Sequence, residues 1–215
     1  LRSPLELVKK TPFRFLVEDV LPNLSHLTHV DLGGSLVRVK DPKTGAFNDA
    51  RLRKDLIALM ALLPKSKNLR ELGLRGFPFG VVTVKTFGRL LQRLADVGMK
   101  GGPRQMVYLD LQGALKLKAI PSLFKSILPG LQGGGGFLRT LDLSYNAFGP
   151  GGASVLKDLL PSLPVLRTLL LAGNNLFVGG TPQKHHLKHL NEAFRAASQT
   201  VQHLELGYNR MSYLD

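Results

Sequence analysis

The stretch Leu-Arg-Thr-Leu-Asp-Leu-Ser-Tyr-Asn-Ala-Phe at residues 138–148 decides the fold of this 215-residue chain. Leucines stand at its first, fourth and sixth positions, followed by an asparagine and a further apolar residue. Close copies of this pattern begin at Leu166 and Val201, and decayed copies begin at Leu27, Leu69 and Met106. A pattern that recurs every few tens of residues marks a repeat architecture, in which each unit buries its apolar face against its neighbours. We therefore expect one elongated structure of six units.

Within each unit, the alternation of leucines with other residues predicts a short strand whose leucines face inward. Stacked copies of such a strand form a parallel sheet. The asparagine after the strand, present as Asn146, Asn174 and Asn209, stands where the chain must turn. Its amide is expected to bond backbone groups of its own unit and of the next one. Phe77 and Ala114 occupy the same place in earlier units, so those turns need other partners.

Helical patterns separate the strands. The clearest has four leucines at helical spacing between residues 153 and 163, with prolines near its end. Helices are expected at residues 52–63, 84–97, 120–131, 153–163 and 184–197. The fold class is therefore α/β: a solenoid, shaped as a horseshoe, with a parallel β-sheet on its concave face and helices on its convex face.

One unit carries the features of a known subtype. It is 28 residues long, from Leu138 to Leu166, and residues 146–156 read Asn-Ala-Phe-Gly-Pro-Gly-Gly-Ala-Ser-Val-Leu. These features resemble the ribonuclease-inhibitor subtype of leucine-rich repeats, over roughly residues 24–211. The resemblance implies the horseshoe fold and indicates no particular activity. We expect an N-terminal helical cap at residues 1–23 and a single continuous repeat domain at residues 24–215.

Both ends of the chain raise expectations of their own. Because the chain begins at Leu1 instead of methionine, we expect it to be processed or incompletely covered, and a removed organellar presequence would leave no trace. At the other end, Tyr213, Leu214 and Asp215 follow the sixth strand directly. Terminal repeats expose an apolar face, so further chain or a partner is expected to cover that edge.

The overall charge is strongly basic. Lysine and arginine number 29 against 15 acidic residues, which gives a net charge of +14 and a pI near 10.3. Such a charge favours a polyanionic neighbour such as nucleic acid. The absence of cysteine excludes disulfides, thiolate zinc sites and thiol catalysis, and it favours an intracellular location, with the mitochondrion ahead of the cytoplasm. No apolar run approaches the roughly 18 residues of a membrane span, so no membrane partner is expected.

Cations gather on the predicted helices and on the longest insertion, which separates Leu27 from Leu69 by 42 residues. Residues 37–45 of that insertion alternate and then turn, as a protruding hairpin would. On the helix predicted at residues 84–97, cations at every fourth position project together. An ordinary solvated surface is the alternative for each group. The candidate contacts to an RNA backbone are Arg38, Lys40, Lys43, Arg51, Arg53, Lys54, Lys85, Arg89, Arg93, Lys184, Lys188 and Arg195.

The outward positions of the strands differ in charge from the helices. Their central column holds four carboxylates and no cation, so it would repel phosphate and accept a basic protein segment. A merely solvated sheet is the alternative. Only 7% of the residues are aromatic and none is tryptophan, which argues against a platform that stacks bases. The candidate protein-binding residues of this concave face are His29, Asp31, Glu71, Tyr108, Asp110, Asp142 and Glu205.

No catalytic motif stands out. The sequence contains no Gly-x-Ser-x-Gly elbow, Walker loop, dinucleotide fingerprint or His-Glu-x-x-His motif. The glycine run at residues 133–136 lacks a following Gly-Lys-Ser/Thr and indicates a connector. His185 and His189 share a helix face, but Lys184 and Lys188 beside them would repel a metal ion. We therefore expect neither an enzyme nor a cofactor or metal.

Three functions remain to be compared. The leading hypothesis is a non-catalytic architectural subunit of a large ribonucleoprotein, such as a mitochondrial ribosome or its assembly particle, that contacts RNA backbone and neighbouring proteins. The main alternative is a protein–protein interaction adaptor, cytoskeletal or signalling, that uses the acidic concave face. An activator of a small GTPase ranks third, because proteins of this repeat type with that activity are more often acidic. The basic charge places the ribonucleoprotein first.

Overall fold

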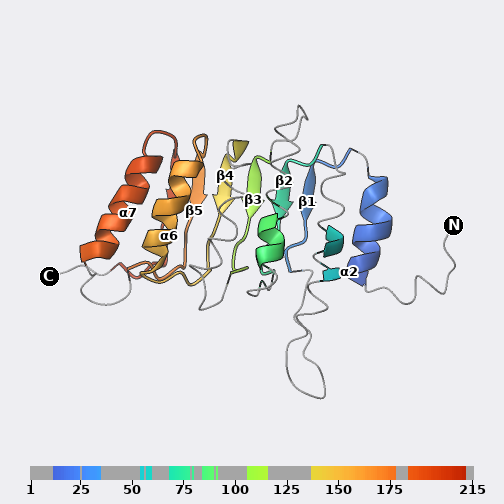
Figure 1. Cartoon of the computed structure of the whole chain (residues 1–215), viewed down its shortest axis with the longest axis horizontal. Helices are drawn as coiled ribbons and strands as arrows, with labels where there is room; N and C mark the ends of the chain where they lie inside the picture. Colours follow the sequence, from blue (N-terminus) through green and yellow to red (C-terminus); the bar gives the residue numbers. More distant parts are fainter. Residues whose placement is uncertain are drawn as a thin grey trace, which may run out of the picture.

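Six short parallel strands form one sheet, in the order in which they occur along the chain (Figure 1). The computed structural model describes residues 12–24, 26–34, 54–55, 57–59, 68–77, 79, 84–89, 91, 106–115, 137–177 and 184–211. Each strand pairs with the next through the equivalent residues of its unit, so matching positions stand side by side across the sheet. The strands are β1 (His29–Asp31), β2 (Glu71–Gly73), β3 (Tyr108–Asp110), β4 (Thr140–Asp142), β5 (Thr168–Leu170) and β6 (His203–Glu205).

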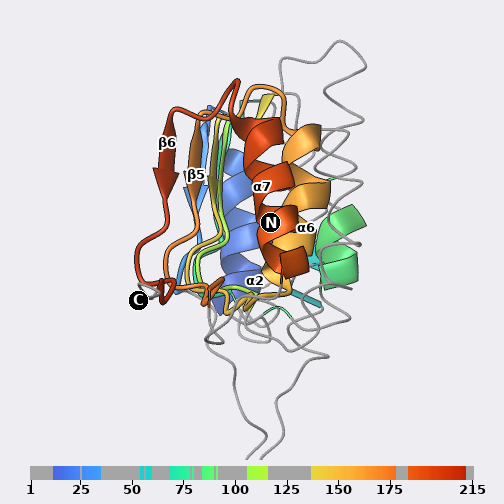
Figure 2. The ribbon, with the colours of Figure 1, turned by 90° about the vertical axis from the view of Figure 1, so that its left-hand side faces the viewer.

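Helices form a second layer on one side of this sheet, and Figure 2 shows no described element on the other side. Together the two layers confirm the predicted α/β solenoid. Further helical turns cover residues 54–55, 57–59, 84–89 and 91. The helices are α2 (Pro12–Phe15), the π-helical turn η1 (Leu16–Val20), the 3₁₀ turn η2 (Leu21–Asn23), α6 (Gly152–Leu159), the 3₁₀ turn η5 (Leu160–Ser162) and α7 (Lys184–Ala197).

Two of the helices test the sequence prediction closely. The helix α7 covers the whole of the range predicted at residues 184–197. The helix predicted at residues 153–163 is α6 followed by η5, because Pro161 cannot continue an α-helical hydrogen-bond pattern and tightens the last turn to 3₁₀. The helix predicted at residues 120–131 lies outside the described residues.

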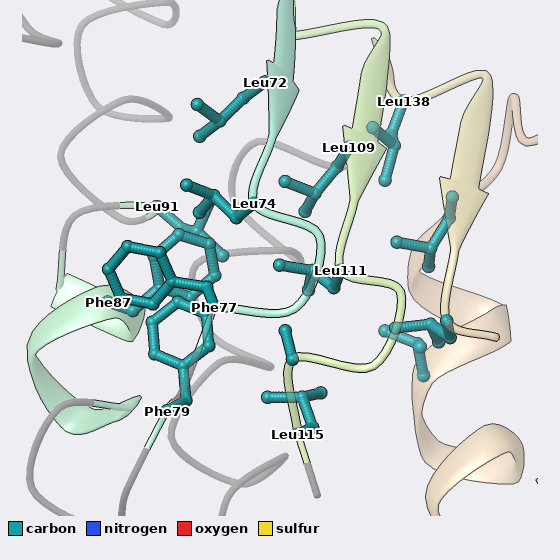
Figure 3. Packing of buried hydrophobic residues seen from close by; sticks show 14 of the residues in the cluster. Leu72, Leu74, Phe77, Phe79, Phe87, Leu91, Leu109, Leu111, Leu115 and Leu138 are labelled. Atoms are coloured by element: carbon teal, nitrogen blue, oxygen red, sulfur yellow. The ribbon is translucent and has the colours of Figure 1, made fainter. Parts of the chain in front are cut away.

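The inward-facing leucines build a continuous core between the two layers. Leu72, Leu109 and Leu141 of neighbouring strands are fully buried. In the middle of the array, Phe77, Phe79 and Phe87 bring their rings together, with centroids 4.7 Å apart for the first pair and 4.8 Å for the second (Figure 3). Such tilted ring pairs add to the stabilisation from burial alone.

A ladder of buried asparagines joins the last three units. The Asn146 side chain donates to the carbonyls of Leu143 (2.7 Å) and Leu111 (3.0 Å) and accepts the Leu115 N–H (2.6 Å). Asn174 and Asn209 repeat this arrangement. The expectation that each amide bonds the next unit is wrong: the partner is the preceding unit, because the turn there leaves N–H and carbonyl groups without a strand to bond.

The earlier turns use backbone bonds instead, as their lack of asparagine requires. The Phe77 N–H donates to the Leu74 carbonyl at 3.0 Å, and the Ala114 N–H donates to the Leu111 carbonyl at 3.1 Å. Phe77 then places its ring in the core, where an amide would stand in a regular unit. Each of these turns thus has a backbone bond of its own, and the turn at Ala114 also bonds the Asn146 side chain of the following unit.

The segment before β1 packs against the same core. Phe13, Val17 and Leu21 are buried and belong to the core cluster. The boundary between a cap at residues 1–23 and a repeat domain at residues 24–215 stays a prediction. None of the described helices is long and apolar enough to cross a membrane.

Candidate protein-binding face

The strand pairing arranges the exposed face of the sheet into two columns. In β1 to β5 the residue between the two columns is buried against the helical layer, so both columns face the side of the sheet on which Figure 2 shows no described helix. The second column contains four carboxylates and no cation. The sequence predicted this charge pattern for the central column of the concave face. The first column is His29, Glu71, Tyr108, Thr140, Thr168 and His203, and the second is Asp31, Gly73, Asp110, Asp142, Leu170 and Glu205.

Three carboxylates of the second column are held by the backbone. Oδ1 of Asp31 accepts the Gly33 N–H at 2.7 Å, and Asp110 and Asp142 each accept the N–H two residues ahead at 2.8 Å. Because this bond fixes the position of each carboxylate, the negative charge stays in line along the column. The absence of a side chain at Gly73 leaves room for the Asp31 carboxylate. A Cβ added at Gly73 would lie 2.5 Å from the Asp31 carboxylate oxygen.

The carboxylates differ in their access to solvent. Asp31 and Glu205 are exposed and Asp110 is partly buried, whereas Asp142 is only 8% exposed. A partner would therefore contact Asp31, Asp110 and Glu205 directly, whereas Asp142 would act mainly through its electric field. The sequence alone gave no reason to separate Asp142 from the others.

Two side chains of β3, Tyr108 and Asp110, have raised pKa values. Burial raises the pKa of the Tyr108 hydroxyl, and the negative charges of Asp110, Asp142, Asp31 and Glu71 raise it further. Burial also raises the pKa of Asp110, assisted by Asp142 and Asp31 and opposed by the Gln112 N–H and by Arg75. These shifts show that the negative charges act on one another across neighbouring strands.

One side-chain contact joins neighbouring strands in the first column. His29 Nδ1 lies 2.7 Å from Glu71 Oε2, with both side chains about half exposed. An exposed pair of this kind contributes little to stability.

Five of the predicted RNA-contacting cations belong to the helical layer. Lys54, Lys85, Arg89, Lys188 and Arg195 are exposed on helical residues. Lys188 lies 3.9 Å from Glu192, and Lys157 of α6 lies 3.0 Å from the same carboxylate, whose pKa these cations lower. Arg38, Lys40, Lys43, Arg51, Arg53, Arg93 and the side chain of Lys184 lie outside what the structure describes.

The histidines of α7 lie close together without forming a metal site. The ring centroids of His185 and His186 are 4.0 Å apart, and those of His185 and His189 are 6.3 Å apart. Among the described residues, no group of three or more potential ligands could hold a metal ion.

Sequence analysis missed two sets of exposed residues. The first set is three arginines that each stand one residue before a strand, namely Arg70, Arg139 and Arg167. The available signal was the recurrent Leu-Arg-x-Leu at residues 69–72, 138–141 and 166–169.

The second set is two tyrosines in a left-handed backbone conformation, Tyr145 and Tyr208, with φ of 58° and 57°. Elsewhere glycine fills this position, as Gly34, Gly76, Gly113 and Gly173.

The comparison with known families agrees with this architecture. A family model described as "Leucine Rich repeat" matches residues 137–157, which hold β4, its asparagine turn and the start of α6. The chain is a leucine-rich repeat protein. Its repeats resemble those of the ribonuclease-inhibitor subtype.

Two curated relatives share this leucine-rich repeat region. Ran GTPase-activating protein 2 of Caenorhabditis elegans is 31% identical over 157 residues, which is 70% of this chain and 15% of the relative. Ran GTPase-activating protein 1 of Xenopus laevis is 28% identical over 165 residues, 76% of this chain and 27% of the relative. The chain thus spans less than a third of the length of either relative. The similarity supports a leucine-rich repeat protein.

Proposed function

We propose that this leucine-rich repeat protein is a protein-binding module that recognises a small GTPase of the Ran type through the exposed face of its sheet. The GTPase is suggested by the names of the two relatives. The observation that carries the proposal is the column of Asp31, Asp110, Asp142 and Glu205, which runs across the sheet without a cation. A face of this charge recognises cationic side chains of a partner.

The physical basis is the partial desolvation of Asp110 at the centre of the column. A group whose pKa is raised by burial and by like charges, as Asp110 is, becomes more stable when a cation approaches. Lysine or arginine side chains of a partner supply that cation and form charge-assisted hydrogen bonds with the carboxylates. The Tyr108 hydroxyl, which remains protonated at neutral pH, offers a donor and an aromatic surface at the centre of the face.

The ribonucleoprotein hypothesis stays a prediction. It depends on the exposed cations of the helical layer, which include Lys85 and Arg89. The similarity to Ran GTPase-activating proteins favours the other two hypotheses of the sequence analysis, an adaptor that binds protein by the concave face and an activator of a small GTPase. RNA binding and protein binding are expected on opposite layers of the molecule, so variants of each layer distinguish them.

The test is the affinity of the chain for Ran loaded with a non-hydrolysable GTP analogue, measured by titration calorimetry. Asp110→Asn combined with Glu205→Gln removes two charges from the column and keeps the acceptor for the Gln112 N–H. We expect this double variant to bind about tenfold more weakly, which corresponds to about 1.4 kcal/mol. Lys85→Ala combined with Arg89→Ala is the matched control and should bind as the wild type does. Binding that is lost only in the control, or absent from the wild type, would overturn the proposal.

A further inference from the structure

A row of arginines lies along the edge of the sheet at which the strands begin. Arg70, Arg139 and Arg167 each precede their strand by one residue. Backbone bonds hold the row in register: the Val107 N–H donates to the Arg70 carbonyl, the Arg139 N–H to Val107, and the Arg167 N–H to Arg139, at 2.8–2.9 Å. The order along the edge is therefore Thr28, Arg70, Val107, Arg139, Arg167 and Gln202.

These arginine side chains are exposed and, within the described part of the chain, form no hydrogen bond or ion pair. Arg139 and Arg167 stand directly before adjacent strands, and adjacent strands are about 4.8 Å apart. Arg70 stands two strands farther along, with Val107 between. No residue of the row is acidic, so nothing within it offsets the mutual repulsion of the cations.

We infer that this row binds an acidic, extended segment of a protein partner that lies across the strands. A guanidinium group binds a carboxylate through two parallel hydrogen bonds, and it suits planar anions better than an ammonium group does. The order of the row requires carboxylates opposite Arg70 and opposite the Arg139–Arg167 pair, with an apolar side chain opposite Val107. The inference uses the proposed function only in taking the partner to be a protein.

The position of the row favours a protein over a nucleic acid. The carboxylates of Asp110 and Asp142 follow three residues after the row in their strands, roughly 10 Å away at 3.3 Å per residue. That distance is about one Debye length at physiological salt. A nucleic acid carries phosphates along its whole surface, so part of it would be repelled by these carboxylates. A polypeptide can present acidic residues to the row and basic residues to the column.

The test uses the full chain and a fluorescent oligoglutamate peptide, with binding followed by fluorescence anisotropy at low salt. An oligoglutamine peptide of equal length and a labelled poly(U) RNA are titrated in parallel. Arg139→Glu combined with Arg167→Glu removes the adjacent pair. Lys85→Glu combined with Arg89→Glu makes the same change in net charge on exposed helical residues and is the matched control.

We expect the wild type to bind oligoglutamate and not oligoglutamine, and the row variant to lose about tenfold in affinity. The control should stay within about twofold of the wild type, and thermal melting should show that both variants are folded. Equal losses in the two variants would mean attraction by net charge alone and would overturn the inference. Poly(U) binding that is stronger than peptide binding and lost in the row variant would overturn it in favour of a nucleic acid. Ran is absent from this assay, so its outcome is independent of the GTPase proposal.

Discussion

Asn146 has a fully buried side chain that satisfies three backbone groups from two repeats. Asn146→Ala would remove the acceptor of the Leu115 N–H in the interior, while the carbonyls of Leu143 and Leu111 keep the bonds from Asn174 and Ala114. We expect a loss of about 2–4 kcal/mol in the free energy of unfolding, measured by urea denaturation. Ser154→Ala, at an exposed position of α6, is the control and should change stability by less than about 0.5 kcal/mol. A loss no larger than that of the control would show that water replaces the amide.

Tyr145 adopts a left-handed conformation in which glycine is the usual residue of this protein. A side chain in that conformation costs about 1–2 kcal/mol, although the ring recovers part of this by covering Gly173. We expect Tyr145→Gly to raise the free energy of unfolding by about 0.5–1 kcal/mol, visible as a higher melting temperature. A lower melting temperature would mean that the contact between the ring and Gly173 outweighs the backbone strain.

Asp110 links stability to pH. Its pKa in the folded protein is raised above the ordinary value of 3.8, so the folded state holds the proton more tightly than the unfolded state. The stability that Asp110 contributes is fully present below pH 3.8, the pKa of the unfolded state. It is lost as the pH rises through the raised pKa of the folded state. Asp110→Asn should therefore be more stable than the wild type at about pH 7, and the difference should vanish near pH 3. Urea denaturation at both pH values measures this, and a variant less stable at pH 7 would contradict it.

At the scale of elements, the three phenylalanine rings connect the turn of the second unit to the helical residues 84–89 of the same unit. Phe87 is fully buried and its ring lies 4.8 Å from that of Phe79 (Figure 3). Phe87→Ala should cost about 3–5 kcal/mol, from lost burial and from the cavity that remains. Lys157→Ala, which removes the cation that pairs with Glu192 between α6 and α7, should cost less than about 1 kcal/mol. Chemical denaturation of the two variants measures this ranking, and equal losses would contradict it.

The elements that the sequence predicted best are those in which pattern and packing agree. The strands follow from the leucine alternation, and α7 follows from its helical spacing. The direction of the asparagine bonds was not predictable, because it depends on which neighbouring unit leaves backbone groups unpaired. The burial of Phe77 in the core could not be predicted either. The sequence pattern shows that the asparagine is missing at this position, but it does not show which groups form the bonds in its place.

The sequence predicted the residues of the candidate site but not how deeply each is buried. The column of carboxylates follows from the register of the repeats, because equivalent positions of a solenoid stand side by side. The burial of Asp142 does not follow, since it depends on how the neighbouring side chains pack. The arginine row escaped notice because its residues precede the strands, where alternation gives no direction to a side chain.

At the scale of the whole molecule, the net charge of +14 conceals opposite local charges. Exposed cations stand on the helical layer and at the edge where the strands begin, whereas carboxylates occupy the face of the sheet. Net charge governs solubility and non-specific attraction, but it does not identify the surface that recognises a partner. For this reason the basic composition favoured RNA, while the face of the sheet and the similarity to Ran GTPase-activating proteins favour a protein.

The most direct measurement is hydroxyl-radical footprinting of the chain alone and in the presence of GTP-loaded Ran, read by mass spectrometry. Tyr108 and His203 report on the face of the sheet, whereas Leu187 and His185 report on the exposed surface of α7. The proposed function predicts that Ran protects Tyr108 and His203 and leaves the two α7 residues unchanged. Protection confined to Leu187 and His185, or no protection at a concentration of Ran that saturates binding, would contradict it.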